Sequence, residues 1–199
     1  DCDVDGFTSA SMMFQYLKTI GYFGKINVLH HSGKEHGLSK EIEVPPETTL
    51  LIIPDAGSND VEQCKELREN GIDILILDHH ICDRENPYAV IVNNQNGTYP
   101  NKELSGAGVV YKFLQAVDEY NWTDVADRYL DLVAVGNIGD VMDMHSHETK
   151  RLCTKGLAQI VNPMICALVE ANSFNIKGDP TINDIQFYIV PMMNALIRV

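Results

Sequence analysis

The sequence predicts an α/β fold in which a parallel β-sheet is flanked by helices and the C-terminal half is more helical. Short apolar runs alternate along the chain with segments of helical periodicity, which is typical of βαβ units. The run at 74–77 is uninterrupted, as in strands that are buried on both faces of a sheet. Several runs end in an acidic residue or a histidine. Because open α/β sheets place their sites at the carboxyl ends of the strands, we expect a functional site there.

The first half of the chain is expected to alternate between helices and strands. Residues 7–20 carry apolar side chains at helical spacing and are followed by Gly21, a natural helix end. A polar-faced helix over 61–70 should end in the same way at Gly71. The predicted strands are 26–30, 50–54, 74–77 and 89–92, and the Asn, Gly and Pro residues of 93–101 predict a loop.

The second half is expected to be mainly helical. The predicted helices are 106–120, 128–135, 150–160, 165–171 and 182–194. Pro191 should kink or interrupt the last of them, because proline lacks a backbone N–H. No repeat or clear linker divides the 199 residues, so we expect one domain over 1–199. Asp1 lies inside a motif and no initiator Met precedes it, so we also expect this domain to be truncated at the N-terminus.

The composition restricts the class of protein. No apolar stretch is long enough to cross a bilayer, so no membrane partner is expected. The net charge of −13 disfavours a general nucleic-acid-binding surface, yet it does not exclude a nuclease, because bound metal ions would neutralise several carboxylates. The five cysteines are scattered and include no C-x-x-C pair, which disfavours a disulfide framework or structural zinc site and favours a reducing cytoplasm.

Acidic residues and histidines at the ends of apolar runs predict a metal centre. Asp55 and Asp78 each come at the end of such a run, and the acidic residues of an extended opening segment would share one side of it. Carboxylates with a few imidazoles suit Mn²⁺ or Mg²⁺ better than zinc, so the residues predict a two-metal phosphoesterase. The candidate site residues are Asp1, Asp3, Asp5, Asp55, Asp78, His79, His80 and Asp140.

Some of these features have plainer explanations. The residues after Asp55 include Gly, Ser and Asn, which are typical of a solvated turn. The opening acidic triplet could form a calcium loop, although the glutamate that closes an EF-hand loop is missing. Adjacent histidines at a strand end indicate a metal site more strongly, because a neighbouring carboxylate can orient an imidazole toward an ion.

The order of these motifs resembles that of the DHH phosphoesterases and, within them, of the RecJ-like single-strand exonucleases. Asp78-His79-His80 is similar to the name-giving motif, and residues 1–9 look like the family's D-x-D-x-D-G-x-T-S opening. Asp55 with Gly57 resembles the second motif, and 136–141 the fourth. Other segments that look RecJ-like are 36–39, 93–109 and 191–199; in the last, Met192 and Ile197 stand where the family has Arg and Gly.

The resemblance implies two metal ions and their ligands. Asp3 would bind one ion with help from a histidine upstream of Asp1, a position that precedes this sequence. The other ion would be bound by Asp5, His79 and Asp140, and Asp55 would bridge both ions. Mn²⁺ is the expected metal and Mg²⁺ the alternative.

The resemblance also implies contacts around the ions. His80 would contact the scissile phosphate, Asp78 would support the histidine pair, and Asp1 would hold its loop. Further phosphate contacts are expected at Ser105, Gly106, Gly108 and Arg198. Close helix packing is the alternative explanation for the glycines, and a surface ion pair is the alternative for Arg198.

The implied function is metal-dependent phosphodiester hydrolysis, with 5′-to-3′ digestion of single-stranded DNA by a two-metal hydroxide mechanism as the leading expectation, in DNA repair or recombination. A family enzyme acting on short oligonucleotides, cyclic dinucleotides or pyrophosphate is one alternative. A non-catalytic, metal-binding module of the replication machinery is another, although the intact candidate ligands argue against it. The family's second domain, which closes over the substrate, has no counterpart in this sequence, so a catalytic domain without its substrate-binding partner is expected.

Overall fold

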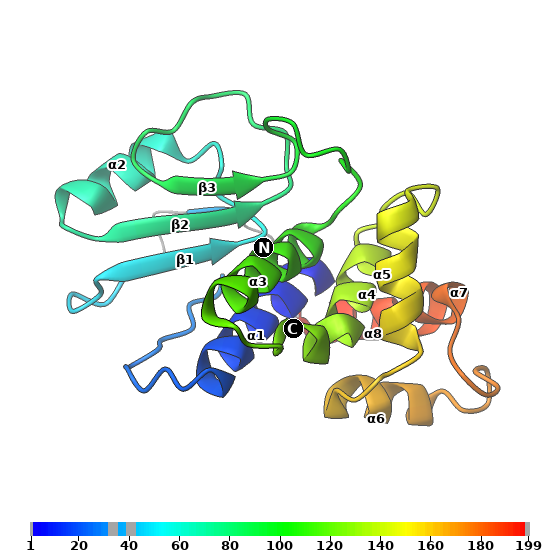
Figure 1. Ribbon diagram of the computed structural model, residues 1–199. Coiled ribbons are helices and arrows are strands. Elements are labelled where there is room, and N and C mark those ends of the chain that lie inside the picture. Colours follow the sequence, from blue (N-terminus) through cyan, green and yellow to red (C-terminus); the bar gives the residue numbers. More distant parts are fainter. Residues whose placement is uncertain (1, 32–35, 39–42, 198–199) are drawn as a thin grey trace.

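The computed structural model describes residues 2–31, 36–38 and 43–197 and confirms the predicted α/β fold (Figure 1). A parallel sheet with the strand order β1-β2-β3 lies on one side of the molecule, and most of the helices lie on the other. The strands are β1 (Leu50–Pro54), β2 (Asp73–Asp78) and β3 (Val90–Asn93). The helices are α1 (Val4–Thr19), α2 (Val61–Glu69), α3 (Gly106–Asn121), α4 (Leu130–Gly139), α5 (His147–Leu157), α6 (Pro163–Ala171), α7 (Ile182–Asp184) and α8 (Val190–Ile197), with a 3₁₀ turn at Ala126–Tyr129 and a π-helical turn at Ile185–Ile189.

Helices cover both faces of the sheet, as the uninterrupted apolar runs predict. Ile74 and Ile76 of β2 pack in one apolar cluster with Cys64 of α2. Leu75 and Leu77 face a second, larger cluster that contains residues of α1 and α3. Successive side chains of a strand point to opposite faces, so this alternation requires a layer of helix on each side of the sheet.

The register of the sheet brings the ends of β1 and β2 together. Pro54, the last residue of β1, is paired with Leu77, and the next backbone amide, that of Asp55, donates to the Leu77 carbonyl at 2.8 Å. Asp78 ends β2 one residue later and is paired with Asn93 of β3. The residues that follow β1 and β2 therefore leave the same edge of the sheet side by side.

The helical half is built around α4. All side chains from Leu130 to Ile138 are buried, and α4 packs against α1, α3 and α5. A helix that is buried all round is held by its neighbours rather than by one apolar stripe. Asp140, the residue after this helix, is consequently carried on a rigid element.

Two expectations for the N-terminal region were wrong. The opening segment is not an extended strand, because Asp3 caps α1 by accepting a hydrogen bond from the Gly6 amide at 3.0 Å, and the helix begins at Val4. Residues 26–30 form no strand either. A cavity of about 540 Å³ lies among this segment, α1 and β1, so these residues do not reach the edge of the sheet.

The remaining elements match the predicted ones to within a few residues. The interruption expected near Pro191 is the π-helical turn at Ile185–Ile189, which directly precedes α8. Proline has no N–H to donate within a helix, so a widened turn before it is a common adjustment. Among the described helices, none combines the length and the apolar character that crossing a membrane would need.

Candidate metal centre

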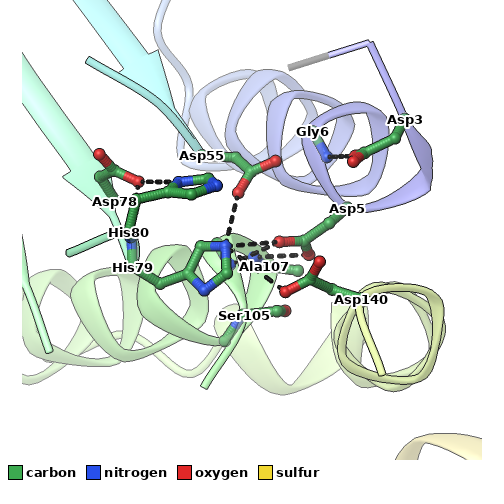
Figure 2. A network of polar contacts seen from close by, with 12 residues as sticks. Asp3, Asp5, Gly6, Asp55, Asp78, His79, His80, Ser105, Ala107 and Asp140 are labelled. Carbon is green, nitrogen blue, oxygen red and sulfur yellow. Dashed lines mark hydrogen bonds and ion pairs between the residues drawn. The ribbon is translucent and has the colours of Figure 1, made fainter. Parts of the chain in front are cut away.

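The predicted ligands meet where the carboxyl ends of β1 and β2 face the helices (Figure 2). Asp55 follows β1 and His79 follows β2, so the sheet supplies these two side chains. Asp5 lies in the first turn of α1, and Asp140 is the C-cap of α4. Two layers of the fold thus contribute to one cluster.

His79 lies at the centre of this cluster. Its Nε2 atom is 3.2 Å from Asp55 Oδ1, 3.6 Å from Asp140 Oδ2 and 3.8 Å from Asp5 Oδ2. Donor atoms of Asp5, His79 and Asp140 lie within 4.8 Å of one another, and so do those of Asp55, His79 and His80. The structure therefore offers two overlapping sets of oxygen and nitrogen ligands that share His79.

The environment of Asp55 fits a cation. Its side chain is almost wholly buried, yet Oδ1 accepts no hydrogen bond from the described residues. Burial, together with the negative charge of Asp5, raises the pKa of Asp55 well above its usual value. A buried carboxylate oxygen without a donor is costly unless a positive charge compensates it. A divalent cation would supply that charge.

The protonation states of the neighbouring groups agree with this interpretation. Burial, aided by the charges of Asp5 and Asp3, raises the pKa of Asp140 from 3.8 to about 7. Burial also lowers the pKa of His79 despite the nearby carboxylates, so the ring is neutral near neutral pH. Neutral imidazole is the form that coordinates a metal.

Backbone amides at the start of α3 fix the carboxylate of Asp5. Gly106 N donates to Asp5 Oδ2 at 2.6 Å, and Ala107 N donates to Oδ1 at 3.0 Å. The N-terminus of a helix favours a negative charge because its first N–H groups have no partner within the helix. Sequence reasoning missed this role, since nothing in the local pattern links residues so far apart in the chain.

Two glycines make room for the carboxylates. A Cβ atom built on Gly106 would overlap Asp55 Oδ1, and one built on Gly136 would lie 2.5 Å from Asp5 Oδ1. Any larger residue at either position would push a candidate ligand out of place. These glycines of α3 and α4 are therefore constrained by the site itself.

The start of α3, where phosphate contacts were expected, makes hydrogen bonds within the protein. Ser105 is fully buried and caps the helix, with its hydroxyl accepting from the Gly108 amide. The Gly106 amide is bound to Asp5. The backbone amides of Ser105, Gly106 and Gly108 thus have acceptors inside the protein, and the three residues have a structural role in this arrangement.

His80 and Asp78 form a separate pair beside the cluster. Asp78 Oδ1 accepts from the His79 and His80 amides at 2.7 and 3.1 Å and lies 2.8 Å from His80 Nδ1. Burial alone would raise the pKa of Asp78, but hydrogen bonds from His80 and Ser58 lower it below its usual value. The hydrogen bond to Asp78 in turn raises the pKa of His80. Asp78 therefore holds the backbone of both histidines and the ring of His80 through hydrogen bonds.

The remaining predicted residues are placed less centrally. Asp3 is half-buried and caps α1, and its negative charge contributes to the raised pKa values of Asp55 and Asp140. It is not a member of either set of ligands formed by the described residues. Asp1 and Arg198 lie outside the described residues.

Asn137 is a site residue that sequence reasoning did not find. It is fully buried in α4, where its Oδ1 accepts from the Ser105 amide at 3.1 Å and its Nδ2 donates to the Val133 carbonyl at 2.8 Å. This side chain ties the helix that ends at Asp140 to the helix start that holds Asp5. A polar residue inside a largely apolar helix was the available signal, but its partner could not be read from the sequence.

Comparison with known proteins shows which proteins this chain resembles. The sequence model described as DHH family, N-terminal domain, matches residues 1–137. The chain is 42% identical over 200 residues to a Bacillus subtilis protein whose provisional name is SPbeta prophage-derived single-strand DNA-specific exonuclease YorK, with 100% of this chain and 34% of that protein covered. It is 30% identical over 218 residues to the single-stranded-DNA-specific exonuclease RecJ of Bacillus subtilis, with 100% and 26% covered.

Solved structures agree in fold. The crystal structure of exonuclease RecJ bound to manganese superposes with a TM-score of 0.86 at 27% identity and covers 100% of this chain and 51% of that one. The structure of RecJ from Thermus thermophilus in complex with Mn²⁺ has a TM-score of 0.78 at 25% identity, with 98% and 28% covered. The chain spans about a third or less of the length of the two curated relatives described above.

Proposed function

The chain belongs to the DHH family, and from this premise we propose that it carries the catalytic metal centre of a single-strand-specific DNA exonuclease. Relatives that match over the whole chain, YorK and RecJ, bear that activity in their names. The chain covers only part of each, so the activity, the 5′-to-3′ direction and the DNA substrate are proposals for this protein. Short oligonucleotides are included in the proposed substrate class.

One observation carries the proposal: three buried or half-buried carboxylates converge on a single neutral imidazole nitrogen, within 3.8 Å. Repulsion among these carboxylates disfavours the cluster unless cations are present. Oxygen-rich ligands with one or two imidazoles suit Mn²⁺ and also Mg²⁺. RecJ, the structural neighbour described above, was solved with manganese. Mn²⁺ is accordingly the proposed cofactor.

We assign one cation to Asp5, His79 and Asp140, and a second to Asp3, with Asp55 shared between them. When bound, the two cations would neutralise the phosphate and lower the pKa of a water molecule enough to make it a nucleophile at neutral pH. The amides of Gly106 and Ala107 hold Asp5 in place beforehand, so no reorganisation of that ligand is needed when substrate arrives.

His80 is proposed to bind the scissile phosphate. Its Nδ1 is held by Asp78 at 2.8 Å, and its side chain is half exposed. The hydrogen bond to Asp78 favours the charged ring by raising its pKa. A positioned N–H donor on a charged ring stabilises the negative charge that develops on a phosphate in the transition state.

The test is Mn²⁺-dependent digestion of end-labelled single-stranded DNA by the full-length protein. Duplex DNA, a dinucleotide and pyrophosphate serve as parallel substrates, and phosphorothioate blocks at either end report the direction. Stepwise loss from the 5′ end, absent in Asp55→Asn, is the expected result. Cleavage of only the small substrates would indicate a different phosphoesterase activity. The absence of any metal-dependent cleavage would indicate a non-catalytic module.

We also propose a reducing cytoplasm as the compartment. Cys64, Cys82, Cys153 and Cys166 are free thiols in the described structure, and disulfides are rare in that compartment. Alkylation of the denatured natural protein without a reductant, followed by mass spectrometry, should modify every cysteine. A disulfide-linked peptide would contradict this proposal.

A further inference from the structure

Val141 adopts a left-handed backbone conformation directly after the ligand Asp140. Its φ is +56°, in the region that favours glycine. The Val141 amide donates to the Ile138 carbonyl at 3.1 Å, and the Met142 amide donates to the Asn137 carbonyl at 3.0 Å. These bonds close the C-terminus of α4 in a pattern whose left-handed position is most often glycine.

A valine at this position is costly, and neither the backbone nor the core requires it. A β-branched residue with positive φ is a true outlier, whereas glycine would make the same hydrogen bonds without strain. This chain does use glycine at the equivalent positions that end α1 and α2, where Gly21 and Gly71 have φ of +88° and +82°. The side chain of Val141 does not contribute to the core, since 69% of its surface is exposed.

The strained residue Val141 is next to the candidate ligand Asp140 in the chain. Consecutive Cα atoms are about 3.8 Å apart, so Val141 is anchored next to Asp140, whose Oδ2 lies 3.6 Å from His79 Nε2. Another exposed apolar residue is adjacent in the sequence to a site histidine: Ile81 directly follows His80 and is 73% exposed. Residues held in sparsely populated backbone regions cluster at functional sites, where the strain serves a contact.

We propose that the Val141 side chain is an apolar contact for the sugar and base of the nucleotide whose phosphate is cleaved. The inference rests on the function proposed above and adds a determinant of nucleotide binding that the polar cluster lacks. The cluster can bind only the charged phosphate. An apolar side chain on the residue that follows Asp140 would distinguish a nucleotide from other phosphate diesters, and losing a contact of this size weakens binding about tenfold.

The experiment compares Val141→Gly with the wild type in the full-length protein. The variant removes the strain and the side chain together, so its melting temperature should equal or exceed that of the wild type. KM for a short oligo-dT should rise about tenfold with little change in kcat. Hydrolysis of methyl p-nitrophenyl phosphate, a diester without a nucleoside, should not change. Val141→Ile, which keeps a β-branched apolar side chain, should retain the wild-type KM.

Trp122→Gly is the matched control. Trp122 also has a left-handed backbone, with φ of +57°, and is 95% exposed, but it ends α3 about 24 Å from the start of that helix at the site. Its replacement by glycine should leave both substrates unaffected.

Three outcomes would overturn the inference. An unchanged KM for oligo-dT in Val141→Gly would show that the strain serves something other than the nucleotide. Equal losses on oligo-dT and on the simple diester would show that Val141 acts only through Asp140. Failure of the wild-type protein to digest single-stranded DNA would overturn the proposed function and this inference with it. That outcome can be distinguished from the other two because it is seen without any variant.

Discussion

Asp55 and Asp118 are both buried carboxylates, but they differ in the number of hydrogen-bond donors around them. Asp118 of α3 accepts hydrogen bonds from the Tyr16 and Thr123 hydroxyls at 2.8 and 2.6 Å, and from the amides of Val125 and Ala126 at 2.8 and 2.7 Å. Asp55 has a buried oxygen that accepts none from the described residues. A carboxylate surrounded by donors is part of the architecture, whereas one that faces other carboxylates and an imidazole is a candidate ligand.

The pKa values reflect the same difference. Burial tends to raise the pKa of Asp118, but hydrogen bonds from Thr123, Ala126 and Tyr16 outweigh it and lower the pKa below its usual value. Burial and Asp5 raise the pKa of Asp55 instead. The same residue type thus stabilises the fold at Asp118, whereas at Asp55 it leaves a buried carboxylate that a cation would compensate.

Replacing Asp55 by Asn should give the largest effect on activity. Loss of the carboxylate shared by both proposed cations should reduce kcat at least about 10³-fold on single-stranded DNA. Stability without metal should not fall, because the change removes a buried charge that no described donor compensates.

Digestion rates and metal-free urea melts would measure these two effects. Asp73→Asn, at the opposite end of β2 and ion-paired with Arg68 on the surface, is the matched control. Retention of more than a tenth of the wild-type kcat in Asp55→Asn would contradict the assignment of Asp55 as a shared ligand.

Replacing Asp118 by Ala should give the reverse result. Four donors, including two buried amides, would lose their acceptor, so the free energy of unfolding should fall by about 3 kcal/mol. The activity of the protein that remains folded should not change. Urea denaturation measures the loss, and exposed Asp124→Ala should lie within about 0.5 kcal/mol of the wild type. A loss no larger than that of the control would remove Asp118 from the architecture.

The pH dependence of stability should separate the two regions. The pKa of Asp140 is raised to about 7 without metal, so this group binds its proton more tightly in the folded state, and its contribution to stability declines as pH rises toward and through 7. The lowered pKa of Asp118 has the opposite sign, and its contribution is lost only as pH falls through that value.

Mn²⁺ should cancel the loss at high pH. At a concentration of 100 times its Kd, a ligand specific for the folded state adds about 2.7 kcal/mol. Melting curves at pH 5.5 and 8, with Mn²⁺ and with a chelator, measure this gain, which should be greater at pH 8. An equal gain at both pH values would show that the carboxylates of the cluster do not bind the cation.

Replacing Asn137 by Ala should have the smallest effect. The Ser105 amide would lose its acceptor, which costs about 1–2 kcal/mol. A shift of the helix start that holds Asp5 should also lower kcat about tenfold while KM changes little. Exposed Asn70→Ala, at the end of α2, is the control. A kcat equal to that of the wild type would show that Asn137 does not position the site.

The sequence allowed the sheet and the grouping of most candidate ligands to be predicted because both depend on local patterns. The apolar runs that became β1 and β2 ended in Asp55 and Asp78, and parallel strands bring such ends to one edge. The strand predicted at 26–30 was wrong. An apolar run of strand length does not show whether a neighbouring strand is available for pairing.

Other features depend on contacts between distant residues. The sequence pattern predicts an extended segment around Asp5. In the structure Asp3 caps a helix that begins at Val4, and aspartate is a favourable residue for that position. The amides of Gly106 and Ala107 could be expected to bind an anion, but only the folded chain shows that the anion is Asp5. The same holds for Asn137, whose partner lies on another helix.

The candidate ligands come from two layers of the fold, so the site lies at the boundary between the sheet and the helices. Asp55 and His79 move with the sheet, whereas Asp5 and Asp140 move with the helices, which Asn137 and the start of α3 lock together. A displacement of one layer relative to the other would separate these candidate ligands and would also disturb the apolar cluster that Leu77 shares with α1 and α3. If the proposed cations bind here, they would join the sheet to the helices, so metal binding would stabilise the contact between the two layers as well as complete the site.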